Sequence, residues 1–146
     1  MGTYLSKPVT DKCEESGESL DSPVPCSWGL VDMQGWRKSM EDAHVAVTDI
    51  PAPPHLVTDA ADAKVFGVFD GHGGPEVARF CQLYLVSVLT QQPTWKEDNA
   101  MDSSELNPSQ KGVAQALIQT FHALDRMIDD PARRCVLRLF CNQYFC

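Results

Sequence analysis

The stretch that decides the fold of this chain reads Val65-Phe66-Gly67-Val68-Phe69-Asp70-Gly71-His72-Gly73-Gly74-Pro75-Glu76. Its first five residues are apolar or small and predict a short buried strand. Asp70 stands where that strand would end, and the glycines after it predict a sharp turn. Pro75 suits the first turn of a following helix. By itself the pattern fits either a plain strand-turn-helix or a site that presents a carboxylate and an imidazole from a rigid element.

Length and composition narrow the class of protein. The chain has 146 residues, which is enough for one modest domain. Its formal net charge of −8 argues against nucleic acid as a main partner and is compatible with binding a cation through carboxylates. The six cysteines include no C-x-x-C pair, which argues against zinc. We also expect no secretory signal, because the N-terminus lacks an apolar h-region, and no transmembrane segment, because no apolar run approaches the ~20 residues of a membrane span.

Residues 1–25 are expected to form a flexible arm. Residues 1–6 read Met-Gly-Thr-Tyr-Leu-Ser and fit the myristoylation pattern with Gly2 as the acceptor, although an ordinary terminus fits them too. Residues 10–25 are polar and acidic with two prolines, which predicts a linker or irregular arm. One acyl chain gives only reversible membrane binding. The expected location is therefore the cytoplasm, with reversible membrane association through Gly2, and a nuclear location stays open.

Hydrophobic spacing predicts three strands and two helices. Alternation favours strands at residues 27–34, 43–48 and 64–69, with the first two antiparallel to each other. Helical spacing favours helices at 76–91 and 110–128. The expected buried stripe of the first helix is Val77, Phe80, Cys81, Tyr84, Leu85, Val88 and Leu89, and that of the second is Val113, Leu117, Phe121, Leu124 and Ile128. The polar segment between the helices, 93–108, is expected to be an exposed loop.

Two groups of carboxylates flank the predicted strands. Glu41 and Asp42 precede the second strand, and Asp70 follows the third. If these strands are neighbours, the carboxylates meet at one end of the sheet. Hard cations such as Mg²⁺ or Mn²⁺ prefer oxygen ligands of this kind, and Gly71 would add a backbone carbonyl.

Two further side chains extend this chemistry. The guanidinium of Arg37 suits bidentate capture of phosphate. His72 suits proton donation to a leaving group near neutral pH. The combination points to hydrolysis of a phosphate ester by metal-activated water. Taken singly, Arg37 also fits a solvated surface charge, and Glu41 and Asp42 also fit a polar entry to a strand. His44 is expected to face solvent, and Cys81 to be a packed thiol.

Two motifs resemble one family. Gln34-Gly35-Trp36-Arg37-Lys38-Ser39-Met40-Glu41-Asp42-Ala43-His44 resembles the first motif of the metal-dependent protein serine/threonine phosphatases, the PP2C or PPM family, and Val68-Phe69-Asp70-Gly71-His72-Gly73-Gly74 resembles the second. The first residues are also similar to those of members that carry a myristoyl group. The resemblance implies an α+β fold, a truncated part of an α/β/β/α sandwich in which helices pack on one face of an antiparallel sheet. Residues 26–134 would be the N-terminal portion of the phosphatase domain.

The resemblance also implies roles for the candidate residues. Arg37 would bind the substrate phosphate, and His72 would act as general acid. Asp70 would bridge two Mg²⁺ or Mn²⁺ ions, and the Gly71 carbonyl would bind one of them. Glu41 and Asp42 would support metal-bound waters. The implied substrates are proteins that carry phosphoserine or phosphothreonine.

The chain also departs from the family pattern. The later Asp-Gly-x-Trp-Asp and Asp-Asn motifs, which supply further metal ligands, are absent, and Asp98-Asn99 is a chance echo in an acidic segment. The second metal site is therefore expected to be incomplete and the activity of this chain low. Residues 135–146 are rich in cysteine and aromatics and no longer resemble the family, as a frame change, retained intron or alternative exon would produce. The alternative is a non-catalytic, lipid-anchored fragment that binds phosphoproteins or other partners.

Overall fold

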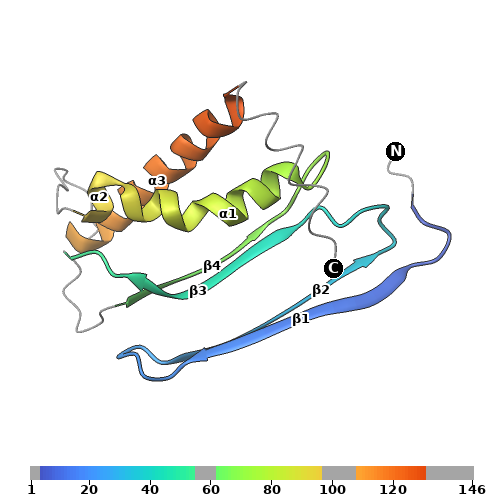
Figure 1. Cartoon of the computed structure of the whole chain (residues 1–146), viewed down its shortest axis with the longest axis horizontal. Coiled ribbons are helices and arrows are strands. Elements are labelled where there is room, and N and C mark those ends of the chain that lie inside the picture. The colour runs from blue at the N-terminus through green and yellow to red at the C-terminus, as the bar shows by residue number, and fades with distance from the viewer. Residues whose placement is uncertain (1–3, 55–61, 97–107, 131–146) are drawn as a thin grey trace.

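The structure is a computed structural model that describes residues 4–54, 62–96 and 108–130. The described elements, in chain order, are β1 (Val9–Ser19), β2 (Cys26–Gly35), β3 (Ala43–Pro51), β4 (Asp62–Phe69), α1 (Glu76–Gln91), α2 (Pro93–Lys96) and α3 (Pro108–Asp129) (Figure 1). The candidate acyl acceptor Gly2 and the terminal segment 135–146 lie outside the described residues.

The strands form two antiparallel pairs that lie in separate layers. β1 pairs with β2, and β3 pairs with β4. The β3–β4 pair lies between the helices and the β1–β2 pair, so that helices cover only one of its faces (Figure 1). The expected α+β fold, with helices packed on one face of an antiparallel sheet, is confirmed.

The register of β3 against β4 determines where the candidate carboxylates lie. Ala43 is opposite Phe69, and the pairing continues to Pro51 opposite Asp62. Asp42 precedes Ala43 and Asp70 follows Phe69, so both residues lie at the same end of this sheet. β3 and β4 are thus neighbours, which is the condition under which the carboxylates were expected to meet.

Two predictions about the N-terminal half are wrong. Residues 10–19 are not irregular, because they belong to β1, which pairs with β2. The ladder begins where Val9 lies opposite Gly35 and ends where Ser19 lies opposite Cys26. Only one face of β1 contacts the rest of the protein, and the polar residues on its other face made it resemble a linker. The strand at 27–34 also does not pair with the strand at 43–48. The connection at 36–42 instead carries the chain from the β1–β2 layer to the β3–β4 layer.

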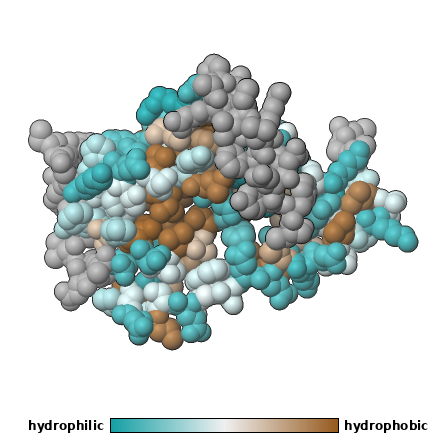
Figure 2. Space-filling view, viewed as in Figure 1, coloured by the Kyte–Doolittle hydropathy of each residue, from teal (hydrophilic) through white to brown (hydrophobic). Residues whose placement is uncertain are grey.

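Side chains from both helical and sheet layers form the core. One cluster combines Val45 of β3 with Phe80, Leu85 and Leu124, and a second combines Ile50, Leu89, Trp95 and Ala116. Figure 2 shows apolar side chains gathered in the middle of this view, where α1 lies over the β3–β4 sheet. Since burial of apolar area is the main stabilising contribution, the two clusters hold α1 and α3 on the sheet.

The predicted bounds of α1 match the structure, but the predicted stripes match only in part. Val77 at the start of α1 is 47% exposed. In α3, Leu117 and Phe121 are exposed. The buried positions instead recur every four residues, and two of them immediately precede Leu117 and Phe121 in the sequence. The members of this buried row are Gly112, Ala116, Thr120 and Leu124. Three of the four are small, and small residues let α3 approach α1 closely, so residue size decided the buried face more than hydrophobicity did.

The segment expected to be an exposed loop starts as a helix. Residues 93–96 form α2, and Trp95 is 6% exposed. Its indole Nε1 donates a hydrogen bond to the carbonyl oxygen of Pro51 at 3.2 Å. The loop prediction is therefore wrong for this first turn, and residues 97–107 lie outside the described part. No described helix is long and apolar enough to cross a membrane.

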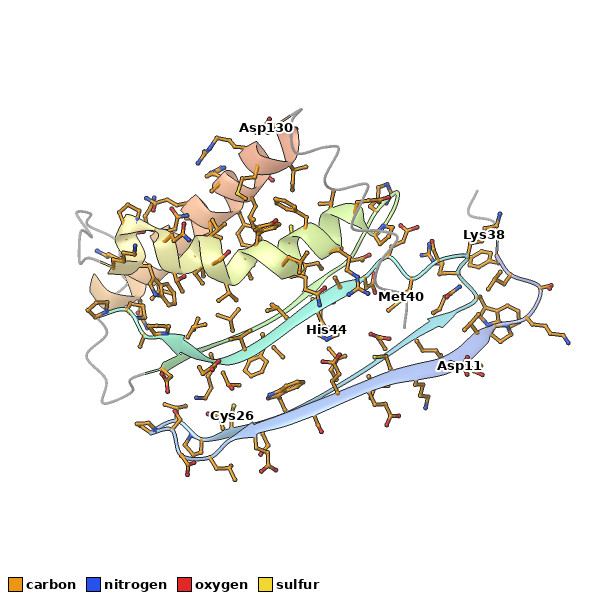
Figure 3. The ribbon with its side chains drawn as sticks, viewed as in Figure 1. Asp11, Cys26, Lys38, Met40, His44 and Asp130 are labelled. Carbon is orange, nitrogen blue, oxygen red and sulfur yellow. The ribbon has the colours of Figure 1, made fainter. Side chains whose placement is uncertain are left out.

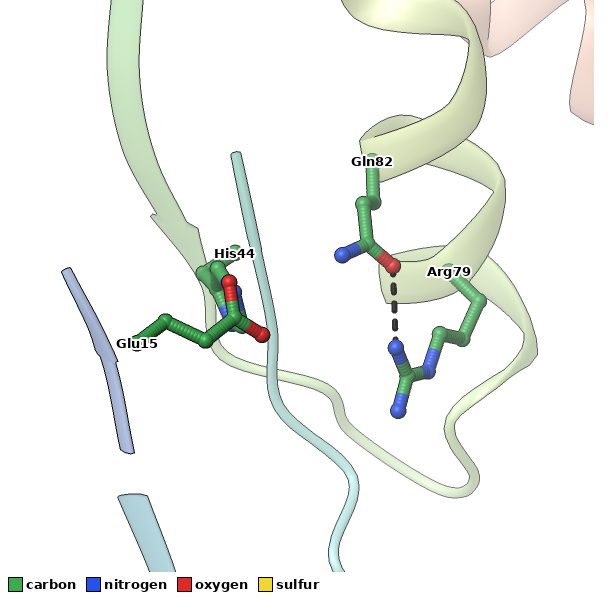
Figure 4. A network of polar contacts seen from close by, with 4 residues as sticks. All are labelled: Glu15, His44, Arg79 and Gln82. Atoms are coloured by element: carbon green, nitrogen blue, oxygen red, sulfur yellow. Dashed lines mark hydrogen bonds and ion pairs between the residues drawn. The ribbon is translucent and has the colours of Figure 1, made fainter. Parts of the chain in front are cut away.

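Three contacts connect the two sheet layers. His44 Nε2 lies 3.2 Å from Glu15 Oε2, and His44 is only 15% exposed (Figure 4). Figure 3 shows His44 pointing from β3 toward the β1–β2 layer, so the expectation that it faces solvent is wrong. The rings of Trp28 and Phe66 lie 6.2 Å apart. Lys64 Nζ completes the set by donating to the hydroxyls of Ser19 and Ser22 at 3.3 and 3.0 Å.

Candidate functional site

Two loops meet at the end of the β3–β4 sheet and form the candidate site. One is the connection 36–42, which enters β3, and the other is the turn 70–75, which leaves β4. The last ladder pair, Ala43 with Phe69, brings the two loops together. The carboxylates are therefore positioned by the backbone hydrogen bonds of the sheet.

Close backbone packing joins these loops. A Cβ atom at Gly71 would overlap the backbone carbonyl of Glu41, so the close approach requires glycine at this position. Gly73 and Gly74 have φ values of 78° and 134°, in the region that residues with a side chain rarely adopt. The turn Asp70–Gly74 therefore depends on its glycines for both proximity and direction.

Hydrogen bonds to Glu41 hold the two loops together. Its Oε1 accepts from Ser39 Oγ at 2.9 Å, and its Oε2 accepts from the backbone N–H of Gly74 at 3.2 Å. The Ser39 bond, followed by the Gly74 and Gly73 amides and the charge of Arg37, lowers the pKa of Glu41, while partial desolvation opposes the shift. The role expected for Glu41, support of metal-bound waters, stays a prediction.

Replacing Ser39 with alanine is expected to raise the pKa of Glu41 toward its ordinary value, because the largest cause of the lowering is removed. In the unmodified protein these bonds stabilise the ionised carboxylate. Their contribution is complete above the ordinary pKa and is lost as the pH falls through the lowered pKa of the folded state. An NMR titration that follows the side-chain carboxyl carbon of Glu41 measures this change in pKa. Ser87→Ala, which removes an exposed hydroxyl bonded only within α1, is the control. An unchanged pKa of Glu41 in Ser39→Ala would contradict the conclusion that the Ser39 hydrogen bond is the largest cause of the lowered pKa.

The other predicted residues lie around the same sheet end. Asp42 and Gly71 are half-buried, whereas Arg37, Asp70 and His72 are exposed. Gln34 Nε2 donates to the carbonyl oxygen of Arg37 at 2.9 Å and so steadies the loop that carries the guanidinium. The structure thus brings Asp42, Asp70 and Gly71 to one end of the sheet.

The donor chemistry of this end suits a hard cation, but the number of donors is small. Carboxylate and carbonyl oxygens are the ligands that Mg²⁺ and Mn²⁺ prefer. Within residues 4–54, 62–96 and 108–130, however, no group of three or more His, Cys, Asp or Glu side chains is placed to hold a metal ion. The described residues therefore fit one part of a cation site and do not close it.

Sequence reasoning missed Ser39 and the Gly74 amide as partners of Glu41. Ser39 stands two residues before Glu41, within reach of a local side-chain bond, and this spacing was the available signal. The Gly74 bond joins residues 33 positions apart, so no local pattern indicated it. The thiol of Cys81 is partly buried beside the core as expected, and burial raises its pKa.

The fold and the site together indicate a class: an α+β protein with antiparallel sheets, helices on one face, and carboxylate oxygens gathered at one sheet end. Comparison with known families agrees, because the protein phosphatase 2C model matches residues 27–137. The chain therefore belongs to the protein phosphatase 2C family. The match ends inside the segment 135–146 that we expected to depart from the family.

Individual relatives give the same result. The chain is 42% identical over 106 residues to "Protein phosphatase 1G" of Homo sapiens, covering 72% of this chain and 17% of that protein. It is 37% identical over 131 residues to "Probable protein phosphatase 2C 3" of Paramecium tetraurelia, covering 90% and 35%. It is 36% identical over 137 residues to "Protein phosphatase 2C homolog 2" of Saccharomyces cerevisiae, covering 92% and 25%. The chain thus spans only a small part of the length of the curated relatives it matches.

Proposed function

We propose that this chain supplies part of the catalytic site of a metal-dependent phosphatase that acts on phosphoserine and phosphothreonine in proteins. Family membership supports the proposal. The single observation that carries it is the β3–β4 register, which brings Asp42 and Asp70 to one sheet end, with Gly71 packed on Glu41.

Each site residue receives a role in this proposal. The exposed guanidinium of Arg37 holds the substrate phosphate through paired N–H donors. Asp70 and the Gly71 carbonyl, with Asp42 and Glu41 in support, hold Mg²⁺ or Mn²⁺. When bound, such an ion supplies hydroxide from water at neutral pH. His72 gives a proton to the serine or threonine oxygen as its bond to phosphorus breaks, so that the product leaves as a neutral hydroxyl.

We further propose that the 146-residue chain by itself binds divalent cations weakly and turns over little substrate. Among the described residues, no group of three or more His, Cys, Asp or Glu side chains is arranged to hold a metal ion. A cation held by so few ligands keeps most of its water and is bound loosely. A loosely held cation would therefore support little turnover by this chain.

Asp70→Asn tests the cation site. Calorimetric titration with MnCl₂ is expected to show one weak site in the unmodified chain and binding weaker by about tenfold or more in Asp70→Asn, since even groups that only support metal ligands have effects of this size. Asp49→Asn, an exposed carboxylate toward the other end of β3, is the matched control and should bind like the unmodified chain. Equal binding in all three proteins would contradict the site.

Turnover of a phosphopeptide in the presence of Mn²⁺ tests the low activity separately. We expect a rate close to that of the Asp70→Asn variant. Rapid Mn²⁺-dependent turnover that disappears in Asp70→Asn would support the phosphatase assignment and contradict the claim that this chain has little activity alone.

A second candidate function is binding of phosphoproteins without turnover. The guanidinium of Arg37 is exposed and forms no ion pair with another described residue, although its charge is among the causes that lower the pKa of Glu41. Retention of a phosphopeptide that is lost in Arg37→Ala, with no Mn²⁺-dependent turnover, would favour this candidate.

We also propose a cytoplasmic location with reversible membrane association through an acylated Gly2, which the sequence pattern of residues 1–6 supports.

A further inference from the structure

The helix α3 has a second apolar side that is open to solvent. Its buried row faces the two core clusters, as described above. A different side carries large apolar residues that remain accessible: Leu117 is 38% exposed, Ile118 51% and Phe121 52%. We call these three residues, together with the half-buried Ala114, the outer stripe of α3.

Helical spacing places these residues on one side of α3. Counted from Ala114, they follow at positions i+3, i+4 and i+7, which is the spacing of neighbours along one side of an α-helix. The other helices meet α3 elsewhere, because α1 packs around Leu124, and Thr94 of α2 donates a hydrogen bond to Gln119 at 2.8 Å. Figure 1 shows α3 at the outside of the molecule, on the far side of α1 from the β1–β2 pair.

Two opposite charges extend the outer stripe by equal distances. Lys111 stands seven residues before Ile118, and Asp125 stands seven residues after it. Residues seven apart lie almost in line on an α-helix, about 10 Å from each other along its axis. The outer stripe therefore ends in a cation on one side and in an anion on the other, with Ile118 at its centre.

The remaining charges of the helical layer keep this polarity. Of the charged residues of α3, with histidine counted as neutral, only Lys111 precedes Ile118, whereas two aspartates and one arginine follow it, and a third aspartate stands directly after the helix. α1 carries one glutamate and one arginine, both among its first four residues, and no charge thereafter. The only charge of α2 is Lys96, and it adds to the positive half because the adjacent Trp95 packs with Ala116.

We propose that α3 pairs side by side and antiparallel with α3 of a second copy of this chain, with the two-fold axis at Ile118. This arrangement places Ile118 against Ile118 of the second copy and the large Phe121 beside the small Ala114 of the second copy. Lys111 then faces Asp125 of the second copy, and the two-fold symmetry repeats this pair on the other side of the axis. A parallel pair would instead set like charges against each other, which disfavours it.

Pairing through the outer stripe leaves the candidate site open. All residues of the outer stripe belong to α3, whereas the loops 36–42 and 70–75 lie at the end of the β3–β4 sheet. Self-association requires neither a metal ion nor turnover, so it can be tested independently of the proposed phosphatase function. An interface built on one helix from each copy is small, and small interfaces give weak and reversible complexes. We therefore expect a dissociation constant of micromolar order or weaker.

Sedimentation velocity of the full chain tests the proposal at concentrations from about 1 μM to about 200 μM, which bracket a dissociation constant of micromolar order. We expect monomer at the lowest concentration and dimer at the highest. Ile118→Lys places a charge at the two-fold axis and should weaken association by at least about tenfold, as the loss of a central contact does. The matched control is Leu83→Lys, which changes a residue of α1 that is 54% exposed and should associate like the unmodified chain.

Two outcomes of this experiment would overturn the proposal. One is a chain that stays monomeric at every concentration, as it would if the outer stripe were reserved for a different partner. The other is an equal loss of association in Ile118→Lys and Leu83→Lys, which would show that any exposed apolar residue contributes and that the outer stripe is not the interface.

Charge reversal tests the antiparallel arrangement and separates a loss of pairing from a loss of folding. Lys111→Asp and Asp125→Lys each set like charges together at both symmetric positions, so each should weaken association by about tenfold. The double variant Lys111→Asp/Asp125→Lys exchanges the two charges and should associate like the unmodified chain. Substitutions that only disturb the fold would not compensate for each other. A double variant that associates as weakly as the single variants would overturn the antiparallel pairing.

Discussion

Replacing Gly71 with alanine is expected to lower the free energy of unfolding by about 2 kcal/mol, within the range that overpacking of a tight contact produces. The added methyl group would overlap the backbone carbonyl of Glu41. Neither partner can move freely, because each follows or precedes a strand of the same ladder. The two loops must therefore separate, which also weakens the bond between Glu41 and the Gly74 amide.

Urea denaturation followed by circular dichroism measures the stability change, and exchange of the Gly74 amide with D₂O measures the loosening of the loops. The matched control is Gly29→Ala in β2, where a Cβ atom would meet no atom within 4 Å and the backbone conformation is an ordinary one. Gly29→Ala should leave stability nearly unchanged. Equal effects of the two substitutions would show that the Gly71–Glu41 contact is not tight in solution.

The sequence predicted the two strands that carry the candidate carboxylates, but not that these strands pair with each other. Alternation placed a strand before Asp70 and another after Asp42, and antiparallel pairing of these strands then brings both residues to one end. The bonds that fix the loops were not predictable in the same way. Gly74 reaches Glu41 only after the turn has folded back, and no spacing rule describes a contact between two irregular segments.

Two errors in the predicted fold have the same physical origin. β1 was taken for a linker because few of its side chains are apolar, yet a strand of a two-layer sheet needs only one face in contact. Gly17 lies opposite Trp28, and the indole ring occupies the space that a side chain at position 17 would fill. The contact therefore depends on the absence of a side chain and not on the hydrophobicity of residue 17. In α3 the buried row includes Gly112 and Thr120, which hydrophobicity alone does not select. In each case a neighbouring element decided which residues are buried.

The largest loss of stability is expected from Leu89→Ala, at about 2–5 kcal/mol, the range for truncating a fully buried leucine. Leu89 is 1% exposed and packs in the cluster with Ile50, Trp95 and Ala116. These partners come from β3, α2 and α3, so the cluster around Leu89 joins several of the elements that pack against α1. A cavity at this point removes contacts on several sides at once and cannot be filled by the movement of one neighbour.

Leu83→Ala on the same helix is the matched control, because Leu83 is 54% exposed and the substitution removes the same atoms. It should change the free energy of unfolding by less than about 0.5 kcal/mol, as surface substitutions do. The midpoint of urea unfolding measures both variants. If the control lost as much stability as Leu89→Ala, α1 would pack through a different face in solution. The helix would then be rotated about its axis, and the turn 70–75 that precedes it would be repositioned with it, which would also alter the candidate site.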